Sequence, residues 1–372
     1  MPESTELLIG LMSGTSLDGV DGVLLAFSAG QPSVREHAFT PFPAALRAEL
    51  LALNTSAADE LHRAALAANG LVRAYAEVVQ SLLTQAGLAP QAVTAIGAHG
   101  QTVRHRPGEF DGTGYTLQLN NPALLVELTG IDVVADFRSR DVAAGGQGAP
   151  LVPLFHREVF GRTDASVCVL NLGGISNLSV LRVDGGVLGF DCGPGNALMD
   201  YWCQRHTGHA FDAGGDWAAS GQVLPALLEA LLSDPYLQAA PPKSTGRDLF
   251  NPDWLDARLS GFHNASPTDV QASLLEFTAQ SCANDLLRYG NGSKTLIVCG
   301  GGALNTALMY RLQAALPGVR VASSADFGLP PLQVEAAAFA WLARKTIRRE
   351  TGSLESITGT QGARVLGAVY PR

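Results

Sequence analysis

Residues 7–27 read LLIGLMSGTSLDGVDGVLLAF: an apolar run, a turn rich in Ser, Gly and Thr, and a second apolar run. Residues 165–181, ASVCVLNLGGISNLSVL, repeat this order. Short apolar runs bounded by such turns predict buried strands. Glycine lets a ligand approach the main chain, and successive backbone N–H groups in a turn form a nest for anions. The two stretches therefore predict two phosphate-binding hairpins, one in each half of the chain.

The segments around these hairpins predict alternating strands and helices. The apolar residues between Leu61 and Leu82 recur at helical spacing, and Gly87 follows as a stop signal. Strands precede helices in both halves, so we expect α/β sheets covered by helices. The glycine-rich run 145–150 is the candidate linker. Further strands are expected at 33–40, 93–98, 116–119, 133–135, 186–190, 295–299 and 364–369, and helices at 122–130, 195–207, 222–232, 266–290 and 332–350.

The composition limits the class of protein. A chain of 372 residues is long enough for two domains with separate cores. The net charge of −9 argues against nucleic-acid binding, because the chain has no excess of basic over acidic residues to bind the phosphates. Five cysteines without a C-x-x-C pair are typical of buried thiols in a reducing compartment, and the sequence has no run of 18 apolar residues. We therefore expect a cytoplasmic protein with no membrane partner.

Several familiar catalytic signatures are missing from the sequence. It contains no G-x-x-x-x-G-K-[ST], so a P-loop is not predicted. It also lacks the G-x-S-x-G nucleophile elbow and a G-x-G-x-x-G after the first strand. The phosphate-binding hairpins must therefore belong to another nucleotide-binding fold.

The first turn carries the largest set of candidate nucleotide ligands. A plain hairpin turn needs one or two glycines rather than a run of Ser, Gly and Thr. Asp18 and Asp21 could hold Mg²⁺ directly or through water, because this ion prefers oxygen ligands. The candidate nucleotide-binding residues here are Gly14, Thr15, Ser16, Leu17, Asp18, Gly19, Val20 and Asp21.

Two further turns add candidate nucleotide ligands. Asn171, Gly173 and Gly174 form the second hairpin turn. Gly300, Gly301 and Gly302 lie between a predicted strand and a predicted helix, which places backbone N–H groups at a helix N-terminus. Close packing of that strand on that helix is the other explanation for the three glycines.

Asp191 is the candidate catalytic residue. It ends an apolar strand, and the sequence Gly-Pro-Gly at 193–195 then turns the chain. A carboxylate at this position can take a proton from an attacking hydroxyl or water. The alternative is an Asx turn that caps the following helix.

Polar residues that follow two other strands are candidate substrate ligands. His99 and Gln101 lie in a polar loop after the strand at 93–98, and such a loop suits a sugar. Arg138 follows the strand at 133–135 and could meet a substrate carboxylate or form a salt bridge.

Six motifs, in order along nearly the whole chain, resemble those of the anhydro-N-acetylmuramic acid kinase family. They lie at 12–21, 99–105, 136–138, 171–177, 189–196 and 299–302. The resemblance implies two related actin-like (ribonuclease H-like) α/β domains with nucleotide and sugar in the cleft between them. Domain I would comprise 1–140 plus about 345–372, with the first hairpin and part of the sugar site. Domain II would comprise 141–344, with the second hairpin, Asp191 and the nucleotide site.

The resemblance also implies a reaction. The family joins 1,6-anhydro-N-acetylmuramic acid, ATP and water to give N-acetylmuramic acid 6-phosphate and ADP, in bacterial cell-wall recycling. Asp191 would be the general base, and Mg²⁺ would accompany ATP. His99, Gln101 and Arg138 would contact the sugar or its lactyl carboxylate. Glu335 resembles a family position near the sugar, although a charge capping a helix is the alternative. The family also suggests a cytoplasmic homodimer.

Two other functions remain open on the residues alone. Another sugar kinase of this fold would use the base on a sugar hydroxyl and consume no water. A non-enzymatic, ATP-switched binding protein would have no clear use for Asp191. Loss of phosphoryl transfer on Asp191→Asn, with ATP binding retained, separates an enzyme from such a switch.

Overall fold

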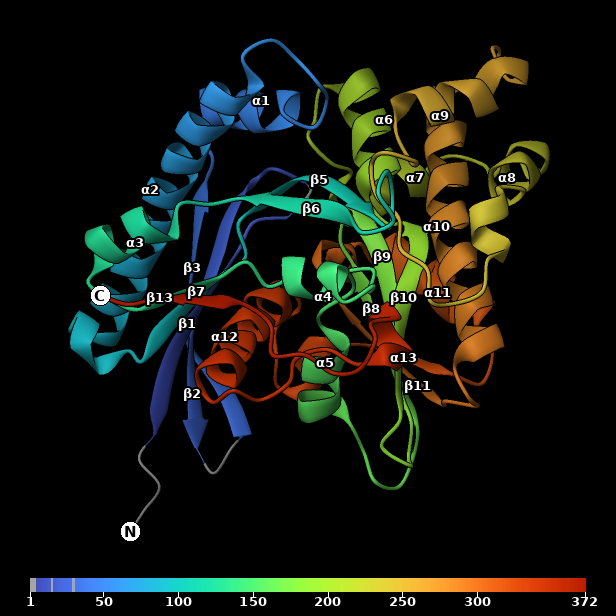
Figure 1. Ribbon diagram of the computed structural model, residues 1–372. Coiled ribbons are helices and arrows are strands. Elements are labelled where there is room, and N and C mark those ends of the chain that lie inside the picture. Colours follow the sequence, from blue (N-terminus) through green and yellow to red (C-terminus); the bar gives the residue numbers. More distant parts are fainter. Residues whose placement is uncertain (1–4, 15, 29–30) are drawn as a thin grey trace. The chain divides into compact units, whose positions relative to one another are not determined.

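The computed structural model describes residues 5–14, 16–28 and 31–372, and the chain divides into two compact units (Figure 1). Unit 1 comprises Met1–Val159 and Leu332–Arg372, and unit 2 comprises Phe160–Pro331. Each unit is an α/β structure, as the alternation of strands and helices predicted. None of the helices among the described residues combines the length and apolar character that crossing a membrane requires.

Unit 1 is built on a six-stranded sheet in the order β13-β7-β4-β1-β2-β3. β1, β2 and β3 form an antiparallel meander, and β4 and β7 continue the sheet parallel to β1. The strands are β1 (Glu6–Met12), β2 (Gly19–Ser28), β3 (Gln31–Pro41), β4 (Ala95–Ala98), β7 (Val133–Ala135) and β13 (Ala368–Tyr370).

Unit 2 repeats this topology in a five-stranded sheet, β10-β9-β8-β11-β12. β8, β9 and β10 form an antiparallel meander, and β11 and β12 follow parallel to β8. The two hairpins that look alike in sequence, β1–β2 and β8–β9, therefore occupy the same place in two related sheets. The strands are β8 (Val167–Leu172), β9 (Ile175–Leu181), β10 (Val187–Pro194), β11 (Thr295–Cys299) and β12 (Arg320–Ser323).

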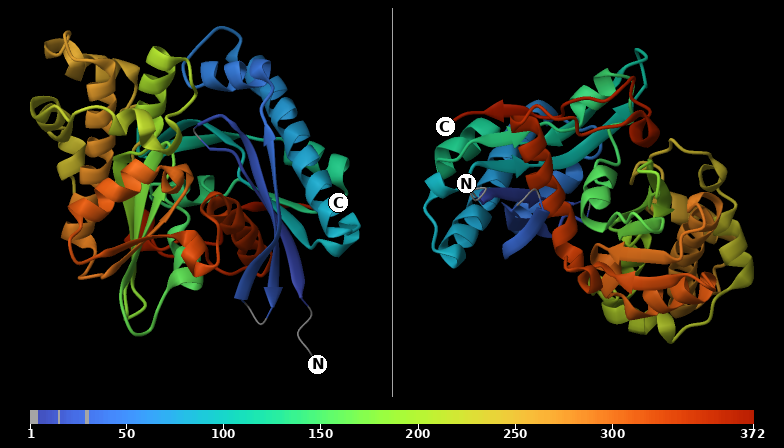
Figure 2. Two further views of the ribbon diagram at one scale, coloured as in Figure 1. Left: turned by 180° about the vertical axis from the view of Figure 1, so that it is seen from behind. Right: turned by 90° about the horizontal axis from the view of Figure 1, so that it is seen from below.

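Helices cover both faces of the unit 1 sheet. Ile9 and Leu11 of β1 face the core formed with α2, whereas Gly10 faces α12. Figures 1 and 2 show α2 and α12 on opposite sides of these strands. The helices of this unit are α1 (Ala44–Ala52), α2 (Glu60–Ala86), α3 (Pro122–Thr129), α4 (Ser139–Ala143), α5 (Pro153–Phe160), α12 (Val334–Ile347) and α13 (Glu355–Thr358), with a 3-10 turn at Pro90–Ala92.

The close approach of α12 depends on two glycines. Gly10 and Gly97 are partners across β1 and β4. A Cβ atom on Gly10 would lie 1.8 Å from the Ala336 carbonyl oxygen, and one on Gly97 would lie 2.0 Å from the Phe339 carbonyl oxygen. Only a pair of residues without side chains lets the helix backbone lie directly on the sheet.

The helices of unit 2 build a second core on one face of its sheet. Leu170, Leu178 and Phe190 of neighbouring strands pack there with Leu274 of α10 and Leu308 of α11. The helices are α6 (Ala197–Thr207), α7 (Asp216–Ala219), α8 (Pro225–Leu232), α9 (Pro252–Arg258), α10 (Pro267–Tyr289) and α11 (Thr306–Ala315), with 3-10 turns at Ala213–Gly215, Pro235–Gln238, Leu259–Gly261, Gly301–Leu304, Ser324–Phe327 and Pro331–Gln333.

The boundaries between the units differ from the predicted 140/141 and 344/345. Residues 141–159 belong to unit 1, because Phe155 of α5 packs on Trp341 and Glu158 accepts a hydrogen bond from its indole N–H. The start of α12 belongs to unit 1 because that helix lies on β1 and β4. The run 145–150 is also not a link between units, since Gln147 donates its backbone N–H to Thr358 O.

Two predicted elements also change. Gln101 does not lie in a loop but begins β5 (Gln101–Pro107), which pairs with β6 (Gly114–Leu119) in a separate hairpin. The last strand is Ala368–Tyr370 instead of 364–369. The sequence did not predict β5, because its largely polar residues show no regular alternation of apolar and polar side chains.

Candidate active site

Three predicted segments of unit 2 meet around Asn196. Asn196 N–H donates to Gly173 O at 2.8 Å, and its side-chain amide donates to Leu172 O at 3.1 Å. A Cβ on Gly302 would lie 3.2 Å from Asn196 Oδ1, and one on Gly195 would lie 2.3 Å from Gly173 O. The second hairpin turn, the Gly-Pro-Gly turn and the triple-glycine turn therefore form one compact assembly of backbone groups.

Close packing accounts for two of the three glycines in the triple-glycine turn. Gly300 has a φ of +79°, and a Cβ there would lie 2.5 Å from Asn171 Oδ1. A Cβ on Gly302 would lie 2.5 Å from the Cβ of Leu172. Close packing thus explains Gly300 and Gly302, whereas a Cβ on Gly301 would meet only the Asn196 amide nitrogen, at 3.6 Å.

Asp191 lies beside a β-bulge. It pairs with Asn177 of β9, the register then shifts, and Gly193 pairs with Ser176, so Cys192 is the extra residue. Gly193 has a φ of +134°, which favours glycine. Bulges of this kind re-aim side chains next to active sites. The Asp191 side chain is buried, at 6% exposure.

Asp191 belongs to a polar row across the sheet. Asn171 of β8 pairs with Asn177 of β9, and Asn177 pairs with Asp191 of β10. Cross-strand partners point to the same face of a sheet. The flanking residues Leu178 and Phe190 enter the core on the opposite face. Asn177 Oδ1 is buried and has no hydrogen-bond partner among the described residues, which leaves an acceptor next to Asp191.

The connection between α8 and α9 holds Asp191 at three points. Thr245 donates its backbone N–H to Asp191 Oδ2 at 3.0 Å. Asp191 donates its own N–H to Lys243 O at 3.2 Å, and the Tyr236 hydroxyl donates to Asp191 O at 2.9 Å. The sequence analysis missed Tyr236, Lys243 and Thr245, because no local spacing signals a contact some 50 residues along the chain from Asp191.

The first turn, in unit 1, has an unusual backbone. Leu17 is buried with a φ of +57°, in the left-handed region that a branched apolar residue seldom adopts. Arg47 Nε donates to Leu17 O at 3.0 Å, and Leu17 N–H donates to Gly14 O at 3.3 Å. Strain of this type clusters at ligand-binding sites. Thr15 lies outside the described residues. Gly19 begins β2, and Val20 is buried.

A hydrogen-bond network ties this turn to the end of β4. The Ser13 hydroxyl donates to Gly100 O at 3.2 Å and lies 3.1 Å from the Tyr75 hydroxyl. Gly100 N–H donates to that same tyrosine oxygen. Gln101 Nε2 donates to Gly14 O at 3.1 Å, while its buried Oε1 has no hydrogen-bond partner among the described residues. Gln101 thus joins the first turn to the start of β5 and keeps a buried acceptor that no described residue uses.

His99 and Arg138 are in direct contact. Arg138 Nε and Nη2 lie 3.1 and 3.0 Å from His99 Nε2, and Arg138 Nη1 donates to Gly148 O at 2.7 Å. Burial, and secondly the charge of Arg138, hold the pKa of His99 well below its usual range. The imidazole is therefore neutral, with Nε2 accepting from the guanidinium. Phe339 of α12 packs on it, with ring centroids 4.6 Å apart.

Glu335 lies on the same helix as Phe339, in the first turn of α12. Side chains four residues apart share a helix face, so Glu335 is one turn from the Phe339 ring that packs on His99. In unit 1 the structure thus brings His99 and Arg138 into contact, bonds Gln101 to Gly14 and places Glu335 in the first turn of α12.

His105 makes folding stability depend on pH. Burial, and secondly Arg138, lower the pKa of His105 from 6.5 to about 4. As pH falls below 6.5 the unfolded chain binds a proton that the folded chain does not, so stability is lost between pH 6.5 and about 4. We expect His105→Gln to remove about 1–2 kcal/mol of the stability difference between pH 7.5 and pH 5. Urea unfolding at the two pH values measures it.

His263→Gln is the matched control, because His263 is exposed. It should leave the pH dependence of the parent protein unchanged. An equal pH dependence in His105→Gln and the parent would contradict the assignment.

The candidate magnesium ligands differ in their surroundings. Asp18 is exposed, and its Oδ1 accepts hydrogen bonds from Ser16 Oγ at 2.8 Å and from Gly19 N–H at 3.1 Å. Asp21 lies on β2, and its Oδ1 is 3.1 Å from His37 Nε2. No group of three or more His, Cys, Asp and Glu side chains suited to a metal occurs in the part of the chain that the structure describes. The oxygen atoms of Asp18 and Asp21 are of the type that Mg²⁺ prefers.

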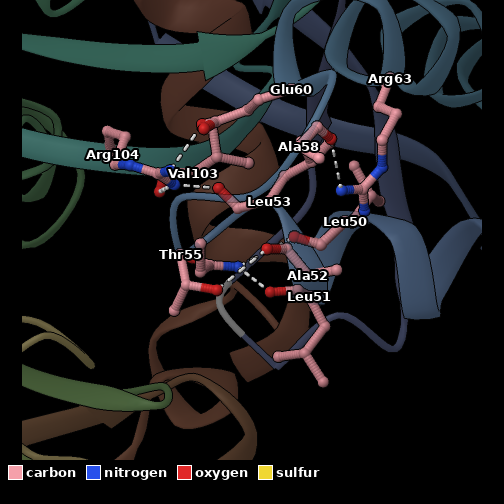
Figure 3. Close-up of polar contacts among 11 residues, drawn as sticks. Leu50, Leu51, Ala52, Leu53, Thr55, Ala58, Glu60, Arg63, Val103 and Arg104 are labelled. Carbon is pink, nitrogen blue, oxygen red and sulfur yellow. Dashed lines mark hydrogen bonds and ion pairs between the residues drawn. The ribbon is translucent and has the colours of Figure 1, made fainter.

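Arg104, close to the candidate sugar ligands, has a structural role. Its guanidinium pairs with Glu60 at 2.6 Å and donates to Leu53 O (Figure 3). These contacts tie β5 to the connection between α1 and α2. They account for Arg104 without a ligand.

Comparison with known proteins finds one family along nearly the whole chain. A model of the family described as anhydro-N-acetylmuramic acid kinase matches residues 6–372. The anhydro-N-acetylmuramic acid kinase of Variovorax paradoxus (strain S110) is 68% identical over 371 residues, covering 98% of this chain and 99% of the relative. That of Albidiferax ferrireducens (strain ATCC BAA-621 / DSM 15236 / T118) is 62% identical over 387 residues, covering 99% and 100%.

Solved structures support the fold. The activator of the 2-hydroxyisocaproyl-CoA dehydratase from Clostridium difficile with bound ADPNP aligns with a TM-score of 0.50 at 12% identity. The alignment covers 92% of this chain and 96% of that one. The likeness concerns the fold alone, and the predicted α/β class with two related actin-like domains is confirmed.

Proposed function

The chain belongs to the anhydro-N-acetylmuramic acid kinase family, and from this premise we propose that it converts 1,6-anhydro-N-acetylmuramic acid, ATP and water into N-acetylmuramic acid 6-phosphate and ADP. The reaction serves cell-wall recycling. It couples hydrolysis of the anhydro bridge to phosphorylation of the oxygen that the bridge releases.

Asp191 is the general base of this reaction. It takes a proton from a water molecule whose oxygen attacks the anomeric carbon. The bond between that carbon and the 6-oxygen breaks, and the electron pair stays on the 6-oxygen. This oxygen attacks the γ-phosphorus, and ADP leaves. One carboxylate thus starts both hydrolysis and transfer.

The environment of Asp191 is the observation that carries this proposal. A buried carboxylate at a β-bulge, with one oxygen held by the Thr245 N–H at 3.0 Å, is oriented before substrate binds. A base fixed in this way loses little entropy on reaching the water. The unpartnered Asn177 Oδ1 next to Asp191 supplies a further polar atom for the reacting groups.

ATP binds through the three glycine-rich turns. The backbone groups of 14–21, of Asn171 to Gly174 and of Gly300 to Gly302 contact the nucleotide, chiefly its phosphates. Asp18 and Asp21 would hold the Mg²⁺ that accompanies ATP, directly or through water. Neutralising phosphate charge is what the metal supplies when bound.

The sugar binds through His99, Gln101, Arg138 and Glu335. A neutral imidazole and an amide with a spare acceptor suit hydroxyl groups. The guanidinium of Arg138 suits the lactyl carboxylate, because the two groups can form paired hydrogen bonds. The enzyme is a cytoplasmic homodimer, and light scattering of the purified protein tests its oligomeric state.

Substrate choice tests the proposed function. ADP release should be measured with 1,6-anhydro-N-acetylmuramic acid, N-acetylmuramic acid and N-acetylglucosamine in parallel. We expect turnover only with the anhydro sugar, because water attack needs the strained bridge as the leaving group. Turnover with the two open sugars and none with the anhydro sugar would make this an ordinary sugar kinase.

A further inference from the structure

We propose that Lys243 is a positioning residue for the reaction: its buried ion pair with Asp285 anchors the segment that orients the Asp191 carboxylate. The inference rests on the proposed role of Asp191 as general base. It concerns a charged pair that none of the sequence motifs contains.

The ion pair is buried within unit 2. Lys243 Nζ lies 3.2 Å from Asp285 Oδ2 of α10, and the two side chains are 4% and 3% exposed. The ammonium group also lies over the rings of Phe190, at 5.5 Å, and Tyr236, at 5.1 Å. A cation over aromatic faces and beside a carboxylate is held in one place.

The same residue contacts Asp191 through its backbone. The Lys243 carbonyl accepts the Asp191 N–H at 3.2 Å, and two residues later the Thr245 N–H donates to Asp191 Oδ2 at 3.0 Å. Tyr236, which packs on the ammonium group, donates its hydroxyl to Asp191 O. Movement of Lys243 would therefore move hydrogen-bonding groups that hold both the backbone and the carboxylate of Asp191.

The segment needs an anchor because it has no regular structure. Residues 239–251 contain neither helix nor strand, so no ladder of backbone hydrogen bonds fixes them. Buried ion pairs add little stability compared with apolar residues of similar size, because both charges lose their hydration. We therefore attribute this pair to fixing the position of the segment rather than to raising the free energy of unfolding. Burial raises the pKa of Asp285, and Lys243 partly offsets that rise.

Three variants test the proposal. Lys243→Met removes the ammonium group, and Lys243→Met with Asp285→Leu removes both charges and leaves no unpaired carboxylate. Lys294→Met is the matched control, because Lys294 is an exposed lysine of the same unit. For each, kcat, the KM for the anhydro sugar and for ATP, the pH profile of kcat/KM and the melting temperature are measured, with assays run below that temperature.

We expect kcat to fall about ten- to a hundredfold in both Lys243 variants, because a displacement of about 1 Å at a catalytic group has effects of this size. The KM for ATP should stay unchanged. The acidic limb of the pH profile should move to higher pH, since the Thr245 N–H no longer favours the ionised Asp191. The double variant should regain most of the melting temperature that Lys243→Met loses, without regaining kcat.

The proposal would be overturned if the double variant had the same kcat as the parent and the same acidic limb in its pH profile of kcat/KM. Lys243 would then be a purely structural residue. A fall in kcat with an unmoved acidic limb would also overturn the proposal, because the rate would then have changed without a change at Asp191. Asp191→Asn, assayed beside these variants, separates the two claims. If Asp191→Asn keeps full turnover, the proposed base is wrong, whatever the Lys243 variants do.

Discussion

Replacement of Asp191 by Asn should lower kcat about a thousandfold, which is the range that a lost general base accounts for. The amide has nearly the same shape and can still accept the Thr245 N–H at its oxygen. It cannot take a proton from water. The affinity for ATP should be unchanged, because Asp191 lies in none of the three nucleotide turns. Steady-state ADP release and ATP titration measure the two quantities.

Asp253→Asn is the control for this comparison. Asp253 is an exposed residue in the first turn of α9, and its amide variant should retain the parent's kcat. Turnover of Asp191→Asn within about threefold of the parent would remove Asp191 from the mechanism. Loss of ATP binding together with turnover would show instead that Asp191 supports the nucleotide site.

Gly10→Ala should destabilise the protein by about 3 kcal/mol, the upper part of the range for an overpacked core. The new methyl group would lie 1.8 Å from the Ala336 carbonyl oxygen and 2.7 Å from the Ala340 nitrogen. Both atoms are helix backbone, so relief requires α12 to leave the sheet. Gly97→Ala should act similarly through Phe339 O. For a chain of 372 residues, a fall in melting temperature of about 4 °C corresponds to this loss.

Gly261→Ala is the matched control, because a Cβ there meets no atom within 4 Å and its φ is ordinary for an L-residue. Its melting temperature should lie within about 2 °C of the parent's. Gly10→Ala should also reduce activity at temperatures below its melting temperature, because the same helix carries Phe339 against His99. If Gly10→Ala had the same melting temperature as Gly261→Ala, the close packing of α12 on the sheet would be contradicted.

The sheets were predictable because their signals are local. The hairpins at 7–27 and 165–181 carry their strands and turns in one stretch of sequence, and the structure forms both. Gly87 ends α2 with a φ of +64°, as the stop signal predicted. The boundaries of the compact units differ from the predicted domain boundaries, because they depend on where α12 packs. That contact joins residues more than 200 positions apart, and no local pattern reports it.

The candidate site also contains residues that a local sequence pattern predicts and residues that no such pattern predicts. The glycine-rich turns and Asp191 were predicted from residue types next to strand ends. Lys243 and Thr245 could not be found, since their contact with Asp191 is made by backbone atoms of an irregular segment. Asp285 lies within a long helix, where a single acidic residue predicts a solvated face rather than a buried pair.

Turnover of the anhydro sugar in ¹⁸O-labelled water, quenched after a single turnover, tests the central claim most directly. Mass spectrometry of the product fragments locates the label, and N-acetylmuramic acid kept in the same water for the same time corrects for exchange. We predict one labelled oxygen on the anomeric carbon and none in the phosphate ester. A label in the phosphate group, or an anomeric oxygen without label, would contradict attack of water on the anomeric carbon and the proposed role of Asp191.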